Sequence, residues 1–331
     1  MAAHSAGLQP ELTTAVYARR LVRWQRDGHW VTSDFRPPHS SSFFTATATA
    51  VRAISFYMPE DLKEERDAAL QNARRWLFEN RPLSTEDAAF RLMGLVWAQA
   101  GKDEIAAAQR DVTSRQVSNG GWPQLSDYAA DAYSTGEALF ALHESGLQAT
   151  DTAFSKGLEF LMATQATDGT WRVTTRMLSP AEVSPKYFTT GFPYGKDEYL
   201  SYAGSCWAVM ALLSGLPGSA HSTHAAAPVP REAPSWLGAA LFGSDRQLAA
   251  LLDAGLDPNS KTPDGTTILM AASADAEKVR LLLARGADAK IRASSGVDAL
   301  TVAAAYPGTA GSIQALLDAG AAERSPRRAR F

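Results

Sequence analysis

The chain has little of what metal, redox or membrane chemistry requires. Its 331 residues include a single cysteine, Cys206, so no intrachain disulfide can form and a cysteine-rich zinc site is excluded. The sequence also lacks any run of about 18 apolar residues, so it predicts no membrane span, and its N-terminus lacks a secretory signal core. We therefore expect a cytoplasmic protein, unless a signal lies upstream of Met1.

A strong charge bias is absent as well. The formal net charge is −3 and 45% of the residues are hydrophobic, as is usual for globular proteins. This balance favours neither nucleic acid nor an anionic membrane as a partner. The length predicts about two domains.

A short motif recurs three times in the N-terminal half. In each copy a glutamine ends a helical pattern, a glycine turn follows, and a tryptophan comes next. A glutamine amide could donate to a helix-end carbonyl that lacks a partner, and the indole could fold back over the amide. Three copies in one chain indicate a helical repeat. The motif residues are Gln25 and Trp30, Gln116 and Trp122, and Gln165, Gly169 and Trp171.

The segments around these motifs predict two alternating sets of helices. The outer set is amphipathic, and we expect it at residues 11–25, 61–79, 102–116 and 151–165. The inner set is rich in small and aromatic residues, which allow close packing, and we expect it at residues 41–57, 85–100, 131–145 and 198–214. The alternation predicts an all-α domain over residues 1–214, built as a partial α/α toroid of about four helical hairpins.

The motif resembles the QW motif of the squalene–hopene cyclase and prenyltransferase family. The resemblance implies a toroid of about six hairpins around an apolar cavity that takes an isoprenoid lipid. With about four hairpins, the ring is open, completed by another chain, or part of a longer protein. The candidate lining residues on inner helices are Trp97, Tyr133, Glu137, Phe140, Tyr202 and Trp207.

The catalytic groups of that family are missing from the sequence. Cyclases of this kind protonate an alkene with a DxDD aspartic acid, and no DxDD occurs here. Asp131 is the one weak candidate, and we interpret it as a helix cap whose pKa is lowered by backbone N–H groups. Prenyltransferases need Asp, Cys and His on zinc, whereas Cys206 lies in an apolar helix and is expected in the core. No metal or cofactor is predicted.

The last hundred residues carry a different repeat. Residues 215–234 form a Pro/Ala-rich linker, in which we interpret His221 and His224 as loop histidines. From Ser235 on, a leucine-rich segment that ends in glycine occurs three times, twice as LLDAGLDPN and LLARGADAK. The glycines are Gly255, Gly286 and Gly320, which are about 31 and 34 residues apart. This pattern resembles the ankyrin repeat, predicts a short solenoid over residues 235–323, and implies a protein partner. A basic tail, residues 324–331, follows.

These observations favour a binding or scaffold protein over an enzyme. In this interpretation the ankyrin repeats engage a protein partner, and the helical domain acts as a scaffold or as a cup for an apolar ligand, an isoprenoid included. The alternative is a degenerate terpenoid-cyclase-like enzyme that acts on an isoprenoid lipid. The absence of DxDD and of the zinc set favours binding.

Overall fold

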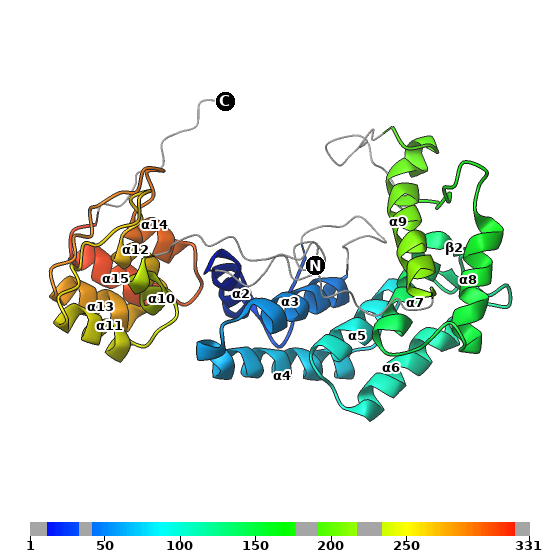
Figure 1. Ribbon diagram of the computed structural model, residues 1–331, viewed down its shortest axis with the longest axis horizontal. Coiled ribbons are helices and arrows are strands. Elements are labelled where there is room, and N and C mark those ends of the chain that lie inside the picture. The colour runs from blue at the N-terminus through cyan, green and yellow to red at the C-terminus, as the bar shows by residue number, and fades with distance from the viewer. Residues whose placement is uncertain (1–11, 33–41, 177–190, 217–233, 322–331) are drawn as a thin grey trace. The chain divides into compact units, whose positions relative to one another are not determined.

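The computed structural model describes residues 12–32, 42–176, 191–216 and 234–321 (Figure 1). The fold is all-α, as predicted, and the regular sheet within these residues is one antiparallel pair, β1 (Trp122–Pro123) with β2 (Ala130–Asp131). Two short 3₁₀ turns occur at Glu60–Leu62 and Gly195–Asp197. The predicted basic tail and most of the predicted linker, including His221 and His224, lie outside the described residues.

Contacts group the chain into two compact units. The first, called here the helical-repeat unit, contains the described residues of 25–56 and 66–225. The second, the C-terminal unit, contains those of 226–331 together with residues 9–24 and 57–65. Two N-terminal segments thus group with the C-terminal residues, whereas the predicted boundaries assign them to residues 1–214.

The helices of the first half begin and end close to their predicted positions. The outer set comprises α2 (Leu12–Trp24), α4 (Lys63–Glu79), α6 (Lys102–Ser114) and α8 (Thr152–Thr164). The inner set comprises α3 (Phe43–Tyr57), α5 (Thr85–Trp97), α7 (Ala132–Glu144) and α9 (Glu198–Ser214). The residue pattern was sufficient to locate them, and in the structure the Ser84 side chain caps α5 by accepting the N–H of Asp87.

Small residues let neighbouring inner helices approach closely. A Cβ atom added to Gly136 of α7 would lie 2.5 Å from the backbone carbon of Trp207 in α9. A Cβ on Gly94 of α5 would lie 3.1 Å from the Cβ of Ala48 in α3. The small-residue composition of these segments therefore reflects helix-to-helix contact along the inner row.

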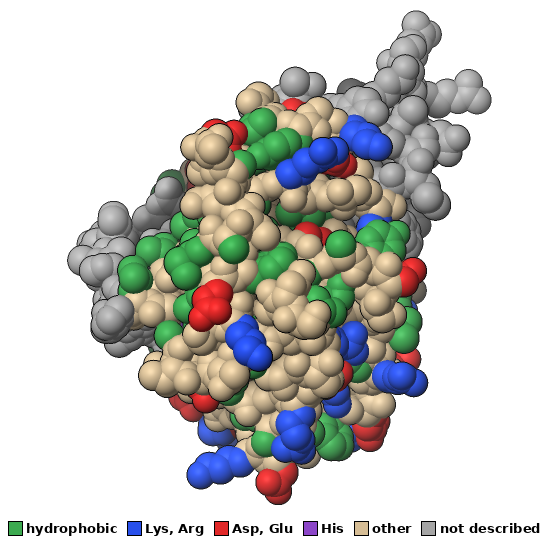
Figure 2. Space-filling view, turned by 90° about the vertical axis from the view of Figure 1, so that its right-hand side faces the viewer, with side chains coloured by type: hydrophobic (Ala, Val, Ile, Leu, Met, Phe, Trp, Pro, Cys, Tyr) green, Lys and Arg blue, Asp and Glu red, His purple; other side chains and the backbone are tan. Residues whose placement is uncertain are grey.

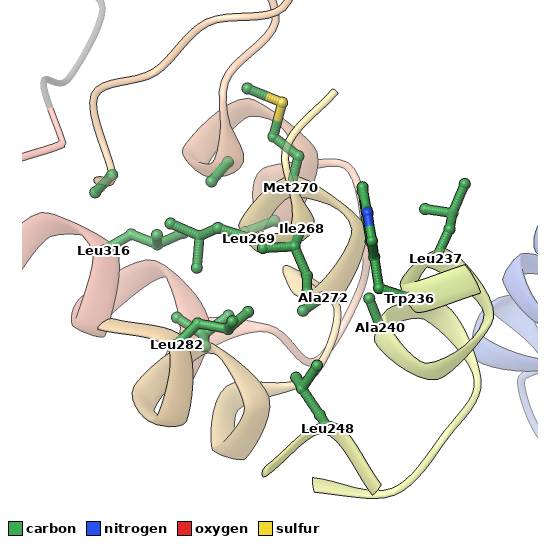
Figure 3. Packing of buried hydrophobic residues seen from close by; sticks show 14 of the residues in the cluster. Trp236, Leu237, Ala240, Leu248, Ile268, Leu269, Met270, Ala272, Leu282 and Leu316 are labelled. Atoms are coloured by element: carbon green, nitrogen blue, oxygen red, sulfur yellow. The ribbon is translucent and has the colours of Figure 1, made fainter. Parts of the chain in front are cut away.

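The C-terminal unit contains three helix pairs with one shared core. The pairs are α10 (Ser235–Leu241) with α11 (Asp245–Asp253), α12 (Ile268–Ala272) with α13 (Ala276–Ala284), and α14 (Ala299–Ala304) with α15 (Ala310–Asp318). Figure 3 shows apolar side chains from the successive pairs in one layer, among them Leu248, Ile268, Leu282 and Leu316, each fully buried. These side chains form the shared core of the three pairs.

Loops between the pairs are joined by hydrogen bonds that involve the backbone. Asn259 Nδ2 donates to the carbonyl of Gly286 at 3.1 Å, and the Asp288 N–H donates to Asn259 Oδ1 at 2.8 Å. The N–H of Ser294 donates to the carbonyl of Asp264 at 3.0 Å. These bonds tie the loop before α12 to the loop before α14.

Candidate functional site

The second and third Gln–Gly–Trp turns are built by hydrogen bonds that differ from the predicted ones. The indole Nε1 of Trp122 donates to the carbonyl of Val112 at 2.7 Å, and that of Trp171 to Leu161 at 2.8 Å. The glutamine amide was predicted to take this role, but Gln165 Nε2 donates to the carbonyl of Gly169 at 2.9 Å. The indole therefore satisfies the helix-end carbonyl, because its longer reach bridges ten residues of chain, and the amide closes the turn.

Each turn is also tied to the inner helix that follows it. The backbone N–H of the tryptophan donates to a hydroxyl on that helix: Trp30 to Thr47 at 3.2 Å, Trp122 to Thr135 at 2.9 Å, and Trp171 to Ser205 at 3.1 Å. All three indoles are buried. The repetition of one bond in three copies explains why the motif holds outer and inner helices together, and it assigns the motif to structure.

Asp131 caps α7, as predicted, but its pKa is shifted in the opposite direction. Its Oδ1 accepts the N–H of Ser134 at 2.9 Å, and its Oδ2 accepts Gln124 Nε2 at 2.7 Å. Burial nevertheless raises the pKa of Asp131 to about 6, against the lowering by these donors and by Arg176. The prediction of a lowered pKa was wrong because removal of the carboxylate from water outweighs its hydrogen bonds.

Glu137 is the most unusual ionisable group of the helical-repeat unit. Its side chain is fully buried one turn after Tyr133, and neither carboxylate oxygen has a hydrogen-bond partner of good geometry among the described residues. Burial raises its pKa well above the ordinary range, and Glu86 and Asp131 add to the rise, whereas the Tyr133 phenol opposes it. Burial therefore favours the protonated form of Glu137.

The remaining candidate lining residues are Phe140, Trp207, Trp97 and Tyr202. Phe140 and Trp207 pack against each other with ring centroids 5.7 Å apart. Trp97 is buried and its indole donates to Glu144 at 2.8 Å, while Tyr202 is 52% exposed. Cys206 is exposed, so its predicted place in the core was wrong: it lies on the same face of α9 as Tyr202, one turn further along.

A cavity of about 440 Å³ lies in the C-terminal unit. Its walls come from the first helix of each pair, from the loops before α12 and α14, and from α2. Apolar side chains such as Met270 and Val302 line it together with polar ones such as Asp264 and Ser295. The face that bears this cavity, formed by α10, α12, α14 and the two loops, is called the groove face below.

Arginines of α2 meet the ends of the helices on the groove face. Arg19 donates to the carbonyl of Leu241, the last residue of α10, and also pairs with Glu65 at 3.2 Å. Arg23 donates to the carbonyl of Ala274, just after α12, at 2.8 Å. Because helix C-termini carry partial negative charge, these guanidinium groups stabilise the position of α2. Burial lowers the pKa of Arg23.

Comparison with known families identifies the C-terminal repeats. Residues 236–325 match the family described as Ankyrin repeats, in three copies, so the predicted ankyrin repeats are confirmed. No curated protein matches the sequence of the chain. Ankyrin repeats support a protein-interaction or scaffold role for this part of the molecule.

Two further features bear on the range of functions. Within the described segments, no group of three or more His, Cys, Asp or Glu side chains is placed to hold a metal ion. In the same segments, every helix is too short or too polar to cross a lipid bilayer.

Proposed function

We propose that the chain is a binding or scaffold protein whose groove face takes a segment of a protein partner. The observation that carries this proposal is the cavity of about 440 Å³ on the groove face. Its lining combines apolar and polar side chains, as protein interfaces do, where apolar contacts accompany polar side chains that set specificity.

The polar side chains of the cavity offer directional contacts that suit a peptide. Asp264 and Ser295 are exposed at the ends of the two loops, and Arg23 contributes a cation from α2. Arg23 Nε is buried without a hydrogen-bond partner among the described residues. A partner that places an acceptor, such as a carboxylate or a backbone carbonyl, beside this nitrogen would complete its hydrogen bonding.

The experiment is affinity capture with matched variants of the full chain. Asp264→Arg and Ser295→Arg change exposed side chains at the cavity without removing core contacts, and each is expected to abolish retention of the partner. Gln314→Arg changes an exposed side chain of α15 that does not line the cavity, and it should retain the same partner. Equal retention by all variants would contradict binding at the groove face.

In this proposal the helical-repeat unit serves as a scaffold or as a cup for an apolar ligand. The alternative is that this unit has a terpenoid-cyclase-like activity. Glu137 supports the enzyme alternative because it is a fully buried carboxyl group, and burial favours the protonated form that an alkene-protonating acid requires. Incubation with squalene and with a polyprenyl alcohol, followed by mass spectrometry, tests it. Cyclised product that disappears with Glu137→Gln would favour the enzyme; no product with either lipid would exclude it for these substrates.

A further inference from the structure

The three Gln–Gly–Trp turns have different neighbours. In the first two copies the glutamine amide reaches the next outer helix: Gln25 Nε2 donates to the carbonyl of Ala69 in α4 at 2.9 Å, and Gln116 Nε2 to that of Ala153 in α8 at 2.8 Å. Gln165 lacks such a contact, since the carbonyl of Gly169 in its own turn is its one acceptor among the described residues. The third turn therefore has a donor placed for a helix that the described chain does not supply.

The turn glycines show the same difference. A Cβ on Gly28 would lie 2.6 Å from the carbonyl oxygen of Asn72, and a Cβ on Gly120 would lie 2.5 Å from that of Lys156. Each of these carbonyls is three residues after the one that accepts the glutamine, so both copies contact the neighbouring helix in the same way. A Cβ on Gly169 would meet only Nε2 of Gln165, at 3.9 Å, within a distance of 4 Å.

Inner helices repeat the pattern. The hydroxyl that accepts the tryptophan N–H gives a common reference point: Thr47 in α3, Thr135 in α7 and Ser205 in α9. The residues three before, one after and four after this point form one face of each helix. In α3 these residues are Phe44, Ala48 and Val51, and in α7 they are Ala132, Gly136 and Leu139; all six are buried. In α9 they are Tyr202, Cys206 and Val209, and all three are exposed.

This exposed face is apolar and continues along α9. Val209 is 46% exposed and Leu213, one turn further, is 55% exposed. On the adjoining outer helix, Met162 is 60% exposed, whereas Thr113, at the matching position before Gln116, is half-buried. Figure 2 views the molecule from the side on which α8 and α9 lie in Figure 1, and several hydrophobic side chains are visible there. Together these residues, with Gln165 and Gly169, form what we call the α8–α9 end.

We propose that the α8–α9 end docks a helical hairpin of a partner protein. The hairpin continues the array in the order seen inside the unit, with its outer helix beside α8 and its inner helix over Tyr202, Cys206 and Val209. Its outer helix presents two backbone carbonyls three residues apart, one to Gln165 and one facing Gly169. The contacts of α8 and α9 with the preceding hairpin provide the geometry, and this docking is independent of the groove face.

The test uses a defined hairpin as the probe. A synthetic peptide of residues 101–146, which contains α6, its turn and α7, has the required outer-to-inner order and no cysteine. Binding of the labelled peptide to the full chain is followed by fluorescence anisotropy. Because Cys206 is the one cysteine and lies on the docking face, its alkylation rate by N-ethylmaleimide reports protection of that face.

The proposal predicts saturable binding and a slowing of Cys206 alkylation by roughly tenfold at saturation. Gln165→Ala should weaken the affinity about fivefold, the effect of one hydrogen bond, and Val209→Asp should weaken it more than tenfold. Leu83→Asp, at a residue 77% exposed elsewhere in the same unit, should leave the affinity unchanged.

Three results would overturn the proposal. One is the absence of binding at peptide concentrations up to about 1 mM, the weak limit of specific association. Another is binding that Gln165→Ala and Val209→Asp leave unchanged. The third is protection of Cys206 without peptide that grows with protein concentration and is lost in Val209→Asp, because the face would then be occupied by a second copy of the chain.

Discussion

The two repeat arrays of this protein join their repeats by different means. In the helical-repeat unit, side chains of the Gln–Gly–Trp turns reach across to backbone carbonyls, as Gln116 does to Ala153. In the ankyrin repeats, backbone groups of the loops meet each other and Asn259, while a layer of leucines provides the shared core. One array thus depends on a few specific side chains, whereas the other spreads its stability over many small contacts.

Glycines at the repeat junctions show what this difference means locally. Gly120 and Gly286 both have a left-handed backbone, with φ of 88° and 91°. Beside Gly120 a Cβ would touch the backbone of α8, but within 4 Å of Gly286 there is nothing for a Cβ to meet. The first glycine is required by conformation and by close approach, and the second by conformation alone.

The largest expected effect is loss of a motif indole. Trp122→Ala should destabilise the helical-repeat unit by about 3–5 kcal/mol, because it empties a fully buried site and leaves the Val112 carbonyl without the indole donor. Trp171→Ala should cost a similar amount. Chemical denaturation monitored by tryptophan fluorescence and circular dichroism measures both, and the transition of the ankyrin repeats should stay where it is. If both unfolding transitions shifted together, the two repeat arrays would not unfold independently, which would contradict this account.

A smaller difference is expected between two glycine variants. Gly286→Ala should cost about 1 kcal/mol from the left-handed backbone alone. Gly120→Ala should cost roughly 2 kcal/mol more, since its Cβ would overlap the Lys156 carbonyl. Paired denaturation curves give the two values, and equal losses would show that the close approach at Gly120 contributes little.

Lys278 is expected to weaken the ankyrin repeats at neutral pH. It is 1% exposed, its Nζ donates to the Ala240 carbonyl at 3.1 Å, and burial lowers its pKa to about 8 from 10.5. The amine of Lys278 loses its proton at a lower pH in the folded chain than in the unfolded chain. The free energy of unfolding should therefore rise as the pH increases from about 8 to 10.5. Lys278→Met should raise stability by about 1 kcal/mol or more at pH 7 and remove that rise. A destabilised variant would indicate that the ammonium is needed.

A second pH-dependent effect is expected at Asp131. Because its pKa is raised to about 6 in the folded state, its contribution to stability is full below pH 3.8 and is lost as the pH rises through 6. Asp131→Asn keeps the cap without the buried charge, so the variant should gain stability relative to wild type as the pH rises from about 4 to 6. The difference in melting temperature between wild type and variant should vary across pH 4–6. A constant difference over that range would contradict the raised pKa.

Much of the fold could be predicted from the sequence because its signals are local. Helical periodicity placed α2 to α9, and the leucine-glycine spacing identified the ankyrin repeats. The location of Cys206 could not be predicted in this way, since an apolar helix at the end of an array has the same pattern as one inside it. The pKa of Asp131 was missed for a related reason: the cap is visible in the sequence, but the burial that outweighs it depends on distant packing.

The candidate site was predicted less completely than the fold. Glu137 was named as a lining residue, but the rise of its pKa comes from burial and, in addition, from Glu86 and Asp131, and the sequence shows neither that burial nor the approach of Glu86. The role of α2 at the groove face could not be read from the sequence either. Arg19 and Arg23 resemble any basic residues of an amphipathic helix, and their acceptors come from residues 241 and 274.

The most direct test of this account is the paired substitution Gln116→Ala and Gln165→Ala, measured by urea denaturation of the full chain. Gln116 donates to its own turn and to α8, so its loss should destabilise the helical-repeat unit by about 1–2 kcal/mol. Gln165 donates to the carbonyl of Gly169 in an exposed turn, so its loss should cost less than about 0.5 kcal/mol. Equal losses from the two substitutions would contradict the claim that the glutamine joins one hairpin to the next and that the α8–α9 end has this joint vacant.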